Sequence, residues 1–351
     1  MPETSTTKRP IHQSGDRQPI RHIAVCIDRS PIGDSAMPHA AVVARAFDAR
    51  LTLLHVLEPL HDGLRAALTD PLDWEVQRTE AQRHLESLLS GYVGVEPDGG
   101  PELTNVVAEV LEGRPAESIR HWVRSQDVDL TVLSSHGERG RTDWALASTA
   151  RKLVEGVRGS VLLVPAHQFA KPSTEAATYR RVLVPLDGSA RAESALAVAD
   201  RIARSEGSEI VLLHVVPDPP HPCPGPLDDQ ERDLDRRLVD RNVRAATAYL
   251  KGVARRLEGD GIRVQTQVEV DSDVRDEIQH RIDLNDVDLV VLSGHGHGGR
   301  AQQPVGSVAR LLIEHLTAPL LIVRDSSPPD PPTGPDARSQ AGVRLPHATD
   351  G

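Results

Sequence analysis

Two segments of the chain carry residue types that can bind phosphate. Residues 286–307 read DVDLVVLSGHGHGGRAQQPVGS, and residues 127–148 read DVDLTVLSSHGERGRTDWALAS. In each segment an apolar stretch, typical of a buried strand, runs into a glycine loop that ends at a helix start. Such a loop can direct backbone N–H groups toward a phosphate, and the positive end of the helix dipole adds to the attraction. The pattern predicts nucleotide binding, and the chain contains it twice.

An aspartate that follows the first strand of each repeat is the second candidate group. Asp187 comes after RVLVPL, and Asp28 comes after HIAVCI. A carboxylate at this place can accept hydrogen bonds from an adenine amino group or from a ribose hydroxyl. A plainer alternative is that both aspartates only cap turns, and that Ser148 and Ser307 only cap the helices after the loops. The repeated spacing favours the binding interpretation.

Histidines near the loops are the third candidate group. His136, His295 and His297 would suit a metal or an acid–base role, but no Cys or carboxylate accompanies them at a metal-binding spacing. We therefore expect no metal site, and we expect these to be solvent-facing loop histidines. His55 and His214, at strand ends, are expected to be structural side chains.

Apolar runs and helical periodicity alternate along the chain and would position these groups. Four strands alternate with helices and a fifth follows the last helix, and the same order begins again near residue 179. Equivalent residues such as Asp28 and Asp187 are 159 positions apart throughout, which indicates one fold duplicated in tandem. The pattern predicts two α/β domains of five strands each, doubly wound around a parallel sheet, because right-handed crossovers place helices on both faces.

The tandem arrangement sets the expected domain boundaries. We expect disordered tails at residues 1–19 and 326–351, where the chain lacks periodicity. Between them lie a first domain at 20–166, a linker at 167–178 and a second domain at 179–325. Ligands of an open parallel sheet bind beyond the carboxyl ends of the strands where the strand order reverses, here between the first and fourth strands. The aspartate and the glycine loop of each repeat are therefore expected to share one crevice.

Apolar periodicity also predicts the helices that cover the sheet. A polar amphipathic helix is expected at about residues 74–89. In the second half, a longer charged helix would direct five apolar side chains toward the sheet, namely Leu234, Leu238, Leu250, Val253 and Leu257.

Composition argues against several classes of partner. The formal charge of −11 leaves no excess of Lys and Arg for nucleic acid or for an anionic membrane as a general partner. Cys26 and Cys223 fit neither a disulfide framework nor a zinc spacing, so both are expected to be reduced thiols. The N-terminus has no apolar signal region, and no run of about 18 apolar residues occurs. We therefore expect a cytoplasmic protein.

These segments resemble the universal stress protein family in its tandem two-domain form, over roughly residues 21–323. The resemblance rests on VPLDGS at the first strand of the second repeat, LLHV at both second strands, DLTVLSSHG and DLVVLSGHG at the fourth, and VLLV and LLIV at the fifth. It implies a Rossmann-like fold of the adenine nucleotide alpha hydrolase type. It also implies that the two fifth strands pair, here within one chain, which would protect two apolar edges from aggregation. Two such chains could associate further as a homodimer.

The second repeat matches the family's nucleotide motif, G-x-x-G, nine residues and G-[ST], more closely than the first. There, nine residues separate Gly296 from Gly306-Ser307, and Ser293 replaces the leading glycine. A side chain at that first position costs little unless the backbone φ is positive. The second domain is therefore expected to hold the working site.

The first repeat departs further from the motif. Nine residues separate Gly137 from Ala147-Ser148, and Ser134 again replaces the leading glycine. Ala147 lies where the backbone would approach a phosphate. We therefore expect the first domain to be the degenerate partner.

The resemblance implies ATP or another adenine nucleotide as the ligand. The contacts expected in the second domain are Pro185, Leu186, Asp187, Val215, Ser293, Gly296, Gly306, Ser307 and Val308. A weaker site in the first domain would use Asp28, Val56, Ser134, Gly137, Ala147 and Ser148. After its third strand the second repeat has Asp271-Ser272-Asp273, where the first has a glycine turn at Gly113. These carboxylates would repel a triphosphate unless a cation such as Mg²⁺ intervenes.

Three functional classes follow from the sequence. The leading one is ATP binding as a sensing or regulatory step of a stress response. The second is protein interaction without nucleotide, carried by the surface of the paired domains. The third and weakest is slow ATP hydrolysis, because the motifs place no general base beyond the two aspartates and the loop histidines. The protein is therefore expected not to be an enzyme.

Overall fold

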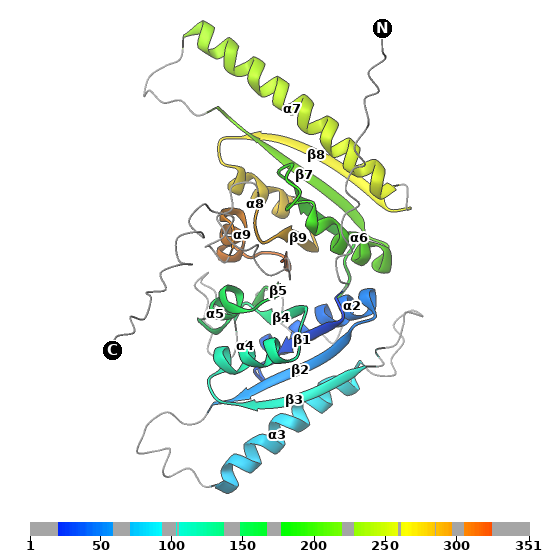
Figure 1. Ribbon diagram of the computed structural model, residues 1–351, viewed down its shortest axis with the longest axis vertical. Helices are drawn as coiled ribbons and strands as arrows, with labels where there is room; N and C mark the ends of the chain where they lie inside the picture. Colours follow the sequence, from blue (N-terminus) through cyan, green and yellow to red (C-terminus); the bar gives the residue numbers. More distant parts are fainter. Residues whose placement is uncertain are drawn as a thin grey trace, which may run out of the picture.

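The protein is organised around one continuous sheet with helices on both faces, as the computed structural model shows (Figure 1). The model describes residues 20–58, 71–92, 103, 105–136, 148–166, 177–219, 228–258, 261–284, 286–296 and 305–324. The expected tails and most of the expected linker lie outside these residues, as do Gly137, Ala147 and His297.

Strands and helices alternate in the order that the sequence predicts. The first half contains β1 (His22–Cys26), α1 (Pro31–Asp34), α2 (Ala36–Phe47), β2 (Arg50–Leu57), α3 (Pro71–Ser90), β3 (Val106–Glu112), α4 (Pro115–Ser125), β4 (Leu130–Ser134), α5 (Ser148–Gly156) and β5 (Ser160–Val164). The second half contains β6 (Arg181–Pro185), α6 (Ser194–Glu206), β7 (Glu209–Pro217), α7 (Asp229–Glu258), β8 (Arg263–Asp271), α8 (Val274–Leu284), β9 (Leu289–Ser293), α9 (Ser307–Glu314) and β10 (Leu320–Val323). The helix expected at 74–89 is α3, which is slightly longer.

The sheet joins the two halves at their fifth strands. Its order is β3-β2-β1-β4-β5-β10-β9-β6-β7-β8. The pairs within each half are parallel, whereas β5 and β10 are antiparallel, with Leu162 opposite Leu321. The doubly wound fold and the pairing of the fifth strands within one chain are therefore confirmed.

Each face of the sheet is covered by helices from both halves. The core on one face lies under α2, α3, α6 and α7, and the core on the other lies under α4, α5, α8 and α9. Both cores are built mainly from Val, Leu, Ile and Ala, because the chain has only 3 Trp, 3 Tyr and 2 Phe. Among the described helices, none is both long and apolar enough to cross a bilayer.

Helix α7 extends past the sheet, and part of the expected packing is wrong there. Leu250, Val253 and Leu257 are buried as predicted, but Leu234 is 68% and Leu238 is 40% exposed. A 30-residue helix is about 45 Å long, whereas the nine residues of β7 or β8 span about 30 Å. The N-terminal part of α7 therefore runs beyond the strands, as Figure 1 shows.

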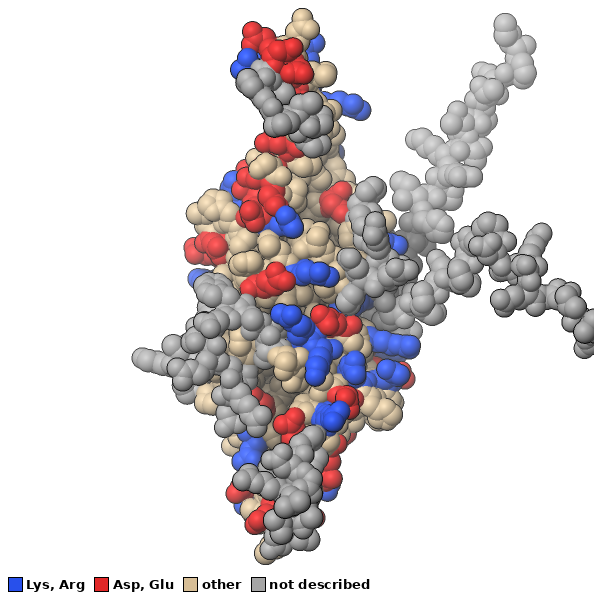
Figure 2. Space-filling model, turned by 90° about the vertical axis from the view of Figure 1, so that its left-hand side faces the viewer, with Lys and Arg blue, Asp and Glu red and all other residues tan. Residues whose placement is uncertain are grey.

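The surface carries both signs of charge in spite of the net charge of −11. Helix α5 and the turn after it present three exposed cations, Arg151, Lys152 and Arg158. Figure 2, which faces the side where α5 and α9 lie in Figure 1, shows Lys and Arg gathered near the middle of the molecule, with acidic side chains beside them. The negative charge is therefore unevenly distributed.

A second contact between the halves packs α2 against α6. His39 on α2 is buried, and its Nδ1 lies 2.8 Å from Oη of Tyr179, which precedes β6. Arg201 on α6 donates from Nε to the carbonyl of Ala46 at 2.6 Å, and its guanidinium lies over the ring of Phe47. The two domains are thus held by polar contacts as well as by the shared sheet.

Arg324, directly after β10, holds the end of α5 in the other half. Its guanidinium donates to the carbonyls of Val157, at 2.9 Å, and Val154. A cation is favourable at this place because the last carbonyls of a helix lack partners within the helix. Burial lowers the pKa of Arg324 to about 10, so the side chain remains charged at neutral pH.

Replacing Arg324 by Met is expected to lower the free energy of unfolding by about 2–4 kcal/mol, because two charge-assisted hydrogen bonds disappear and two carbonyls lose their partner. Urea unfolding at pH 7 measures the change. Arg151→Met, at an exposed position of α5, is the matched control and should stay within about 0.5 kcal/mol of wild type. Equal stabilities for the two variants would contradict this role of Arg324.

Candidate functional site

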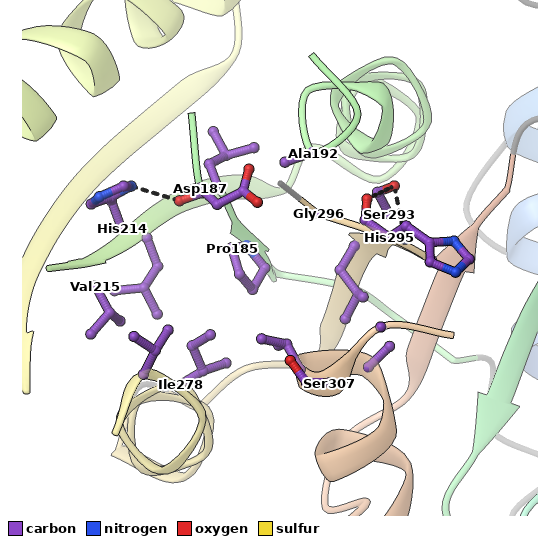
Figure 3. Close-up of a pocket in the computed structure, with 18 of the residues that line it drawn as sticks. Pro185, Asp187, Ala192, His214, Val215, Ile278, Ser293, His295, Gly296 and Ser307 are labelled. Carbon is purple, nitrogen blue, oxygen red and sulfur yellow. Dashed lines mark hydrogen bonds between the residues drawn. The ribbon is translucent and has the colours of Figure 1, made fainter. Parts of the chain in front are cut away.

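The strand order of the second domain reverses beside β6. This strand pairs in parallel with β9 on one side and with β7 on the other. The aspartate after β6 and the loop after β9 therefore meet at one edge of the sheet, as predicted. A pocket of about 520 Å³ opens there (Figure 3), which is a volume typical of small-molecule sites.

The pocket brings together every residue expected at the second site. Pro185, Leu186, Asp187, Val215, Ser293, Gly296, Gly306, Ser307 and Val308 all line it. They come from the ends of β6, β7 and β9 and from the start of α9, so the arrangement depends on the sheet topology.

Asp187 lines one side of the pocket, between His214 and Gly296 (Figure 3). Its Oδ1 accepts a hydrogen bond from the backbone N of Ser189 at 2.9 Å, and Gly188 between them has a φ of +82°. A Cβ added to Gly296 would overlap with Oδ2 of Asp187. Any residue larger than glycine at position 296 would therefore displace the carboxylate.

The start of α9 forms a second side of the pocket. Gly306 is the N-cap residue, with φ −70° and ψ 170°, and Ser307 is the first residue of the helix. No side chain caps this helix, so the capping alternative for Ser307 is wrong. Gly306 N donates to Gly294 O at 2.7 Å, whereas the following amides have no partner within the helix. These N–H groups lie at the positive end of the helix dipole, where an anion is stabilised.

Ser293 stabilises the turn that leads into the loop. Its Oγ donates to the carbonyl of His295 at 2.9 Å. The serine that replaces the leading glycine of the motif is therefore compatible with the turn and contributes a hydrogen bond to it.

The third side of the pocket is apolar. Val215 at the end of β7 faces Val274 and Ile278 from the first turns of α8. His214 beside it donates from Nδ1 to the carbonyl of Leu186 at 2.7 Å. His55 makes the same bond to Ile27 O, at 2.8 Å, in the first domain, which confirms the expected structural role of both histidines.

A comparison with models of protein families matches residues 19–165 and again residues 178–324 to the model described as Universal stress protein family. The chain belongs to the universal stress protein family. The two matched segments correspond to the two halves of the sheet, so each half is one universal stress protein domain.

Relatives of this universal stress protein extend over nearly the whole chain. The universal stress protein Rv1996 of Mycobacterium tuberculosis is 26% identical over 331 residues, covering 88% of this chain and 96% of the relative. A universal stress protein of Mycolicibacterium smegmatis is 25% identical over 314 residues, covering 86% and 96%. A solved universal stress protein from Archaeoglobus fulgidus has a TM-score of 0.57 at 16% identity, covering 87% of this chain and 98% of its own. The last comparison supports the fold alone.

The acidic turn of this universal stress protein follows β8 and adjoins the pocket, because Asp271 pairs with Pro217 in the sheet and Val274, directly after Asp273, lines the pocket. Asp271 ends β8, the outermost strand, whereas α9 follows β9. Three strand spacings of about 4.8 Å place β8 and β9 about 14 Å apart, more than the screening length of physiological salt. Asp273 also pairs with Arg275, with the Nη2 to Oδ2 distance 2.5 Å, and this hydrogen bonding lowers the pKa of Asp273. The repulsion between this turn and a triphosphate, and the need for a cation such as Mg²⁺, stay predictions.

The first domain positions its candidate residues differently. Asp28 Oδ1 accepts from both the backbone N and the Oγ of Ser30, at 3.1 and 2.6 Å, and Arg29 between them has a left-handed φ of 66°. The Oγ of Ser134 donates to the carbonyl of His136. Asp28 is thus bound to its own turn by both the backbone amide and the hydroxyl of Ser30, whereas the bond given above for Asp187 comes from the backbone amide of Ser189.

Other first-domain candidates are only partly described. Val56 is half-buried near the end of β2, and Ser148 begins α5. Gly137 and Ala147 lie outside the described residues. The relative weakness of this site therefore stays a prediction.

Pocket residues that the motif does not contain include Ala192, Val274 and Ile278. The last two come from α8, which lies outside the motif. The sequence feature that could have revealed them is their spacing of four residues at the start of the helix after the third strand of the second repeat. Ile119, 159 positions before Ile278, is buried at the equivalent place in α4.

Histidines do not form a metal centre in the described part of the chain. No group of three or more His, Cys, Asp or Glu side chains there could hold a metal ion. His136 and His295 are half-buried, so each keeps part of its surface in contact with solvent.

Proposed function

We propose that this protein binds an adenine nucleotide, ATP, in the pocket of its second domain as a regulatory step of a cytoplasmic stress response. One observation carries the proposal, namely that a carboxylate, an apolar wall and the free amides of a helix start face the same cavity of about 520 Å³. Each of these suits one part of a nucleotide. A nucleotide bound beside the segment that joins β9 to α9 would change the surface that a partner contacts there.

The three sides of the pocket set the orientation of the nucleotide. The base would lie between Val215 and Ile278, with its amino group or the ribose hydroxyls near Asp187. The phosphates would lie at Gly296 and the start of α9. No Lys or Arg lines the described part of the pocket, so the helix dipole and the backbone amides supply the attraction there, and Mg²⁺ bound with ATP would lower the charge further.

Asp187→Ala is expected to weaken ATP binding at least tenfold, because the variant loses the only carboxylate among the residues that line the described pocket. Isothermal titration of ATP into the full chain measures the affinity. Asp28→Ala, the equivalent change in the first domain, is the matched control and should leave the main affinity unchanged. If Asp28→Ala were the variant that abolished binding, the proposed site would be in the wrong domain.

We also propose that the main activity of the protein is to bind the nucleotide and not to hydrolyse it. The support is the pocket chemistry: His214 is held by its bond to Leu186, and Asp187 is held by Ser189, so neither is poised over the phosphate position beside α9. Phosphate release that Asp187→Ala abolishes would instead identify a slow ATPase.

A second candidate function is protein interaction without nucleotide. The observation that favours it is the exposed pair Leu234 and Leu238 on the projecting part of α7, since exposed apolar side chains on one helix face suit a protein partner. The same titration separates the two functions. No heat at micromolar to millimolar ATP would reject the nucleotide-binding proposal in favour of this one.

A further inference from the structure

A second cavity adjoins the nucleotide pocket on the side of α7. Its volume is about 310 Å³, and it is lined by Gly188, His214, Val216, Pro217, Asn242, Ala245, Ala246 and Tyr249. His214 and Pro217 line both cavities. The two spaces are therefore neighbours across the end of β7.

The equivalent place in the first domain can be located from two matching contacts. His84 Nε2 on α3 lies 2.9 Å from Asp34 Oδ1, and the hydroxyl of Tyr249 on α7 donates to Glu193 Oε1 at 3.0 Å. Asp34 and Glu193 are 159 positions apart, as in the rest of the repeat, and the two helix residues are 165 apart because the second repeat carries a longer insertion. Residues 80 and 245, one helical turn earlier, therefore correspond.

An ion pair fills this place in the first domain. Arg29 Nη2 lies 3.4 Å from Glu80 Oε2. In the second domain Gly188 replaces the arginine and Ala245 replaces the glutamate. A Cβ added to Gly188 would meet nothing within 4 Å, so the missing side chains leave open space. The side chains at this place therefore differ between the two copies of the fold.

The walls of the second cavity suit a flat ring. Val216, Pro217 and Ala246 are apolar, and the hydroxyl of Tyr249 is already bonded to Glu193, so its ring remains as the contact surface. Asn242 adds an amide. Because His214 donates from Nδ1, its neutral imidazole offers Nε2 as an acceptor.

The position of Gly188 connects this cavity to the ligand. Asp187 faces the nucleotide pocket, and Gly188, the next residue, lines the second cavity. A substituent of the nucleotide that is attached next to the atom bound by Asp187 would therefore extend past Gly188 into the second cavity. That atom belongs to the adenine amino group or to the ribose hydroxyls, and not to the phosphates at α9.

We propose that the second cavity is a subsite for an aromatic group, and that the ligand class of this protein includes adenine nucleotides that carry such a group on the base amino position or on the ribose. The inference rests on the proposed function, because it places the nucleotide in the neighbouring pocket. It adds a substituent class that the universal stress protein motif does not specify.

The test compares three nucleotides on the full chain, namely ATP, N6-benzyl-ATP and ATP esterified on the ribose with N-methylanthranilate. Gly188→Arg combined with Ala245→Glu rebuilds the ion pair of the first domain, where Arg29 has a φ of 66°. This double variant should weaken binding of one substituted nucleotide at least tenfold relative to ATP. The nucleotide that responds identifies the group that Asp187 contacts.

Two further variants control for folding and for the glycine change. Gly207→Arg places an arginine at another left-handed glycine with open space, φ +66°, at the end of α6, and should leave all affinity ratios unchanged. Ala245→Phe, at an exposed helix position, fills the cavity without altering the loop and should reproduce the loss.

The outcomes separate this inference from the proposed function. ATP binding to wild type with unchanged ratios in both cavity-filling variants overturns the subsite alone. Failure of all three nucleotides to bind wild type overturns the proposed function, and the subsite with it.

Discussion

Acidification is expected to destabilise the protein because His39 is buried without charge. This residue of α2 is 6% exposed and lies against Tyr179, and burial lowers its pKa from 6.5 to about 4. Between these two pKa values the unfolded chain binds a proton that the native state does not, so the free energy of unfolding falls as the pH falls. From pH 6.5 to 4.5 the loss through this one residue is roughly 2 kcal/mol, because each full pKa unit is worth about 1.4 kcal/mol and the unfolded histidine is only half protonated at pH 6.5.

Urea unfolding across this pH range measures the effect. His39→Gln keeps a polar group near Tyr179 but cannot take up the proton, so its stability should decline less steeply than that of wild type. The difference between the two slopes removes the contribution of the carboxylates, which both proteins share. His121→Gln, at an exposed position of α4, should follow the wild-type curve. Parallel curves for wild type and His39→Gln would show that another group controls the acid sensitivity.

Gly296→Ala is expected to remove at least nine tenths of the affinity for ATP, and Gly306→Ala is expected to leave the fold unchanged. A Cβ at position 296 would overlap with Asp187 Oδ2, so the carboxylate must leave its place in the pocket wall. A Cβ at position 306 would find its nearest atom, Gly294 O, at 3.4 Å, and the φ of −70° suits any residue. The loss at Gly296 corresponds to about 1.4 kcal/mol or more of binding free energy.

Titration of ATP and thermal unfolding of both variants provide the measurement. Gly306→Ala introduces the residue that the first repeat carries at Ala147, and its stability should stay within about 0.5 kcal/mol of wild type. The neighbouring residues leave room for the added methyl group. A loss of ATP affinity in that variant would therefore show that the methyl group prevents a phosphate from reaching the backbone at position 306. Wild-type affinity in Gly296→Ala would contradict the assignment of Asp187 to the ligand.

Much of the site was predictable from the sequence because it depends on short-range patterns. Asp187, Gly296 and Gly306 each follow a strand at a spacing that recurs 159 residues earlier, and parallel strands bring such positions to one edge of the sheet. The pairing of β5 with β10 was expected from the resemblance to the universal stress protein family, and its physical reason is that each strand would otherwise leave an apolar edge open.

Other features depend on lengths and distances that periodicity does not contain. Leu234 and Leu238 continue the apolar stripe of α7, but only the length of the neighbouring strands determines where that stripe leaves the core. The wall formed by Val274 and Ile278 was missed because it comes from a helix outside the motif.

The union of both domains in one chain has a consequence for how the two sites can change. The two strands that pair, β5 and β10, belong to one chain, so the linker between the domains sets their effective concentration. Dilution therefore does not separate the two domains. In a dimer of identical subunits, every substitution would appear in both sites at once. Here Arg29 and Gly188 occupy equivalent positions with different residues, so one half of the sheet could acquire an open cavity while the other kept its ion pair.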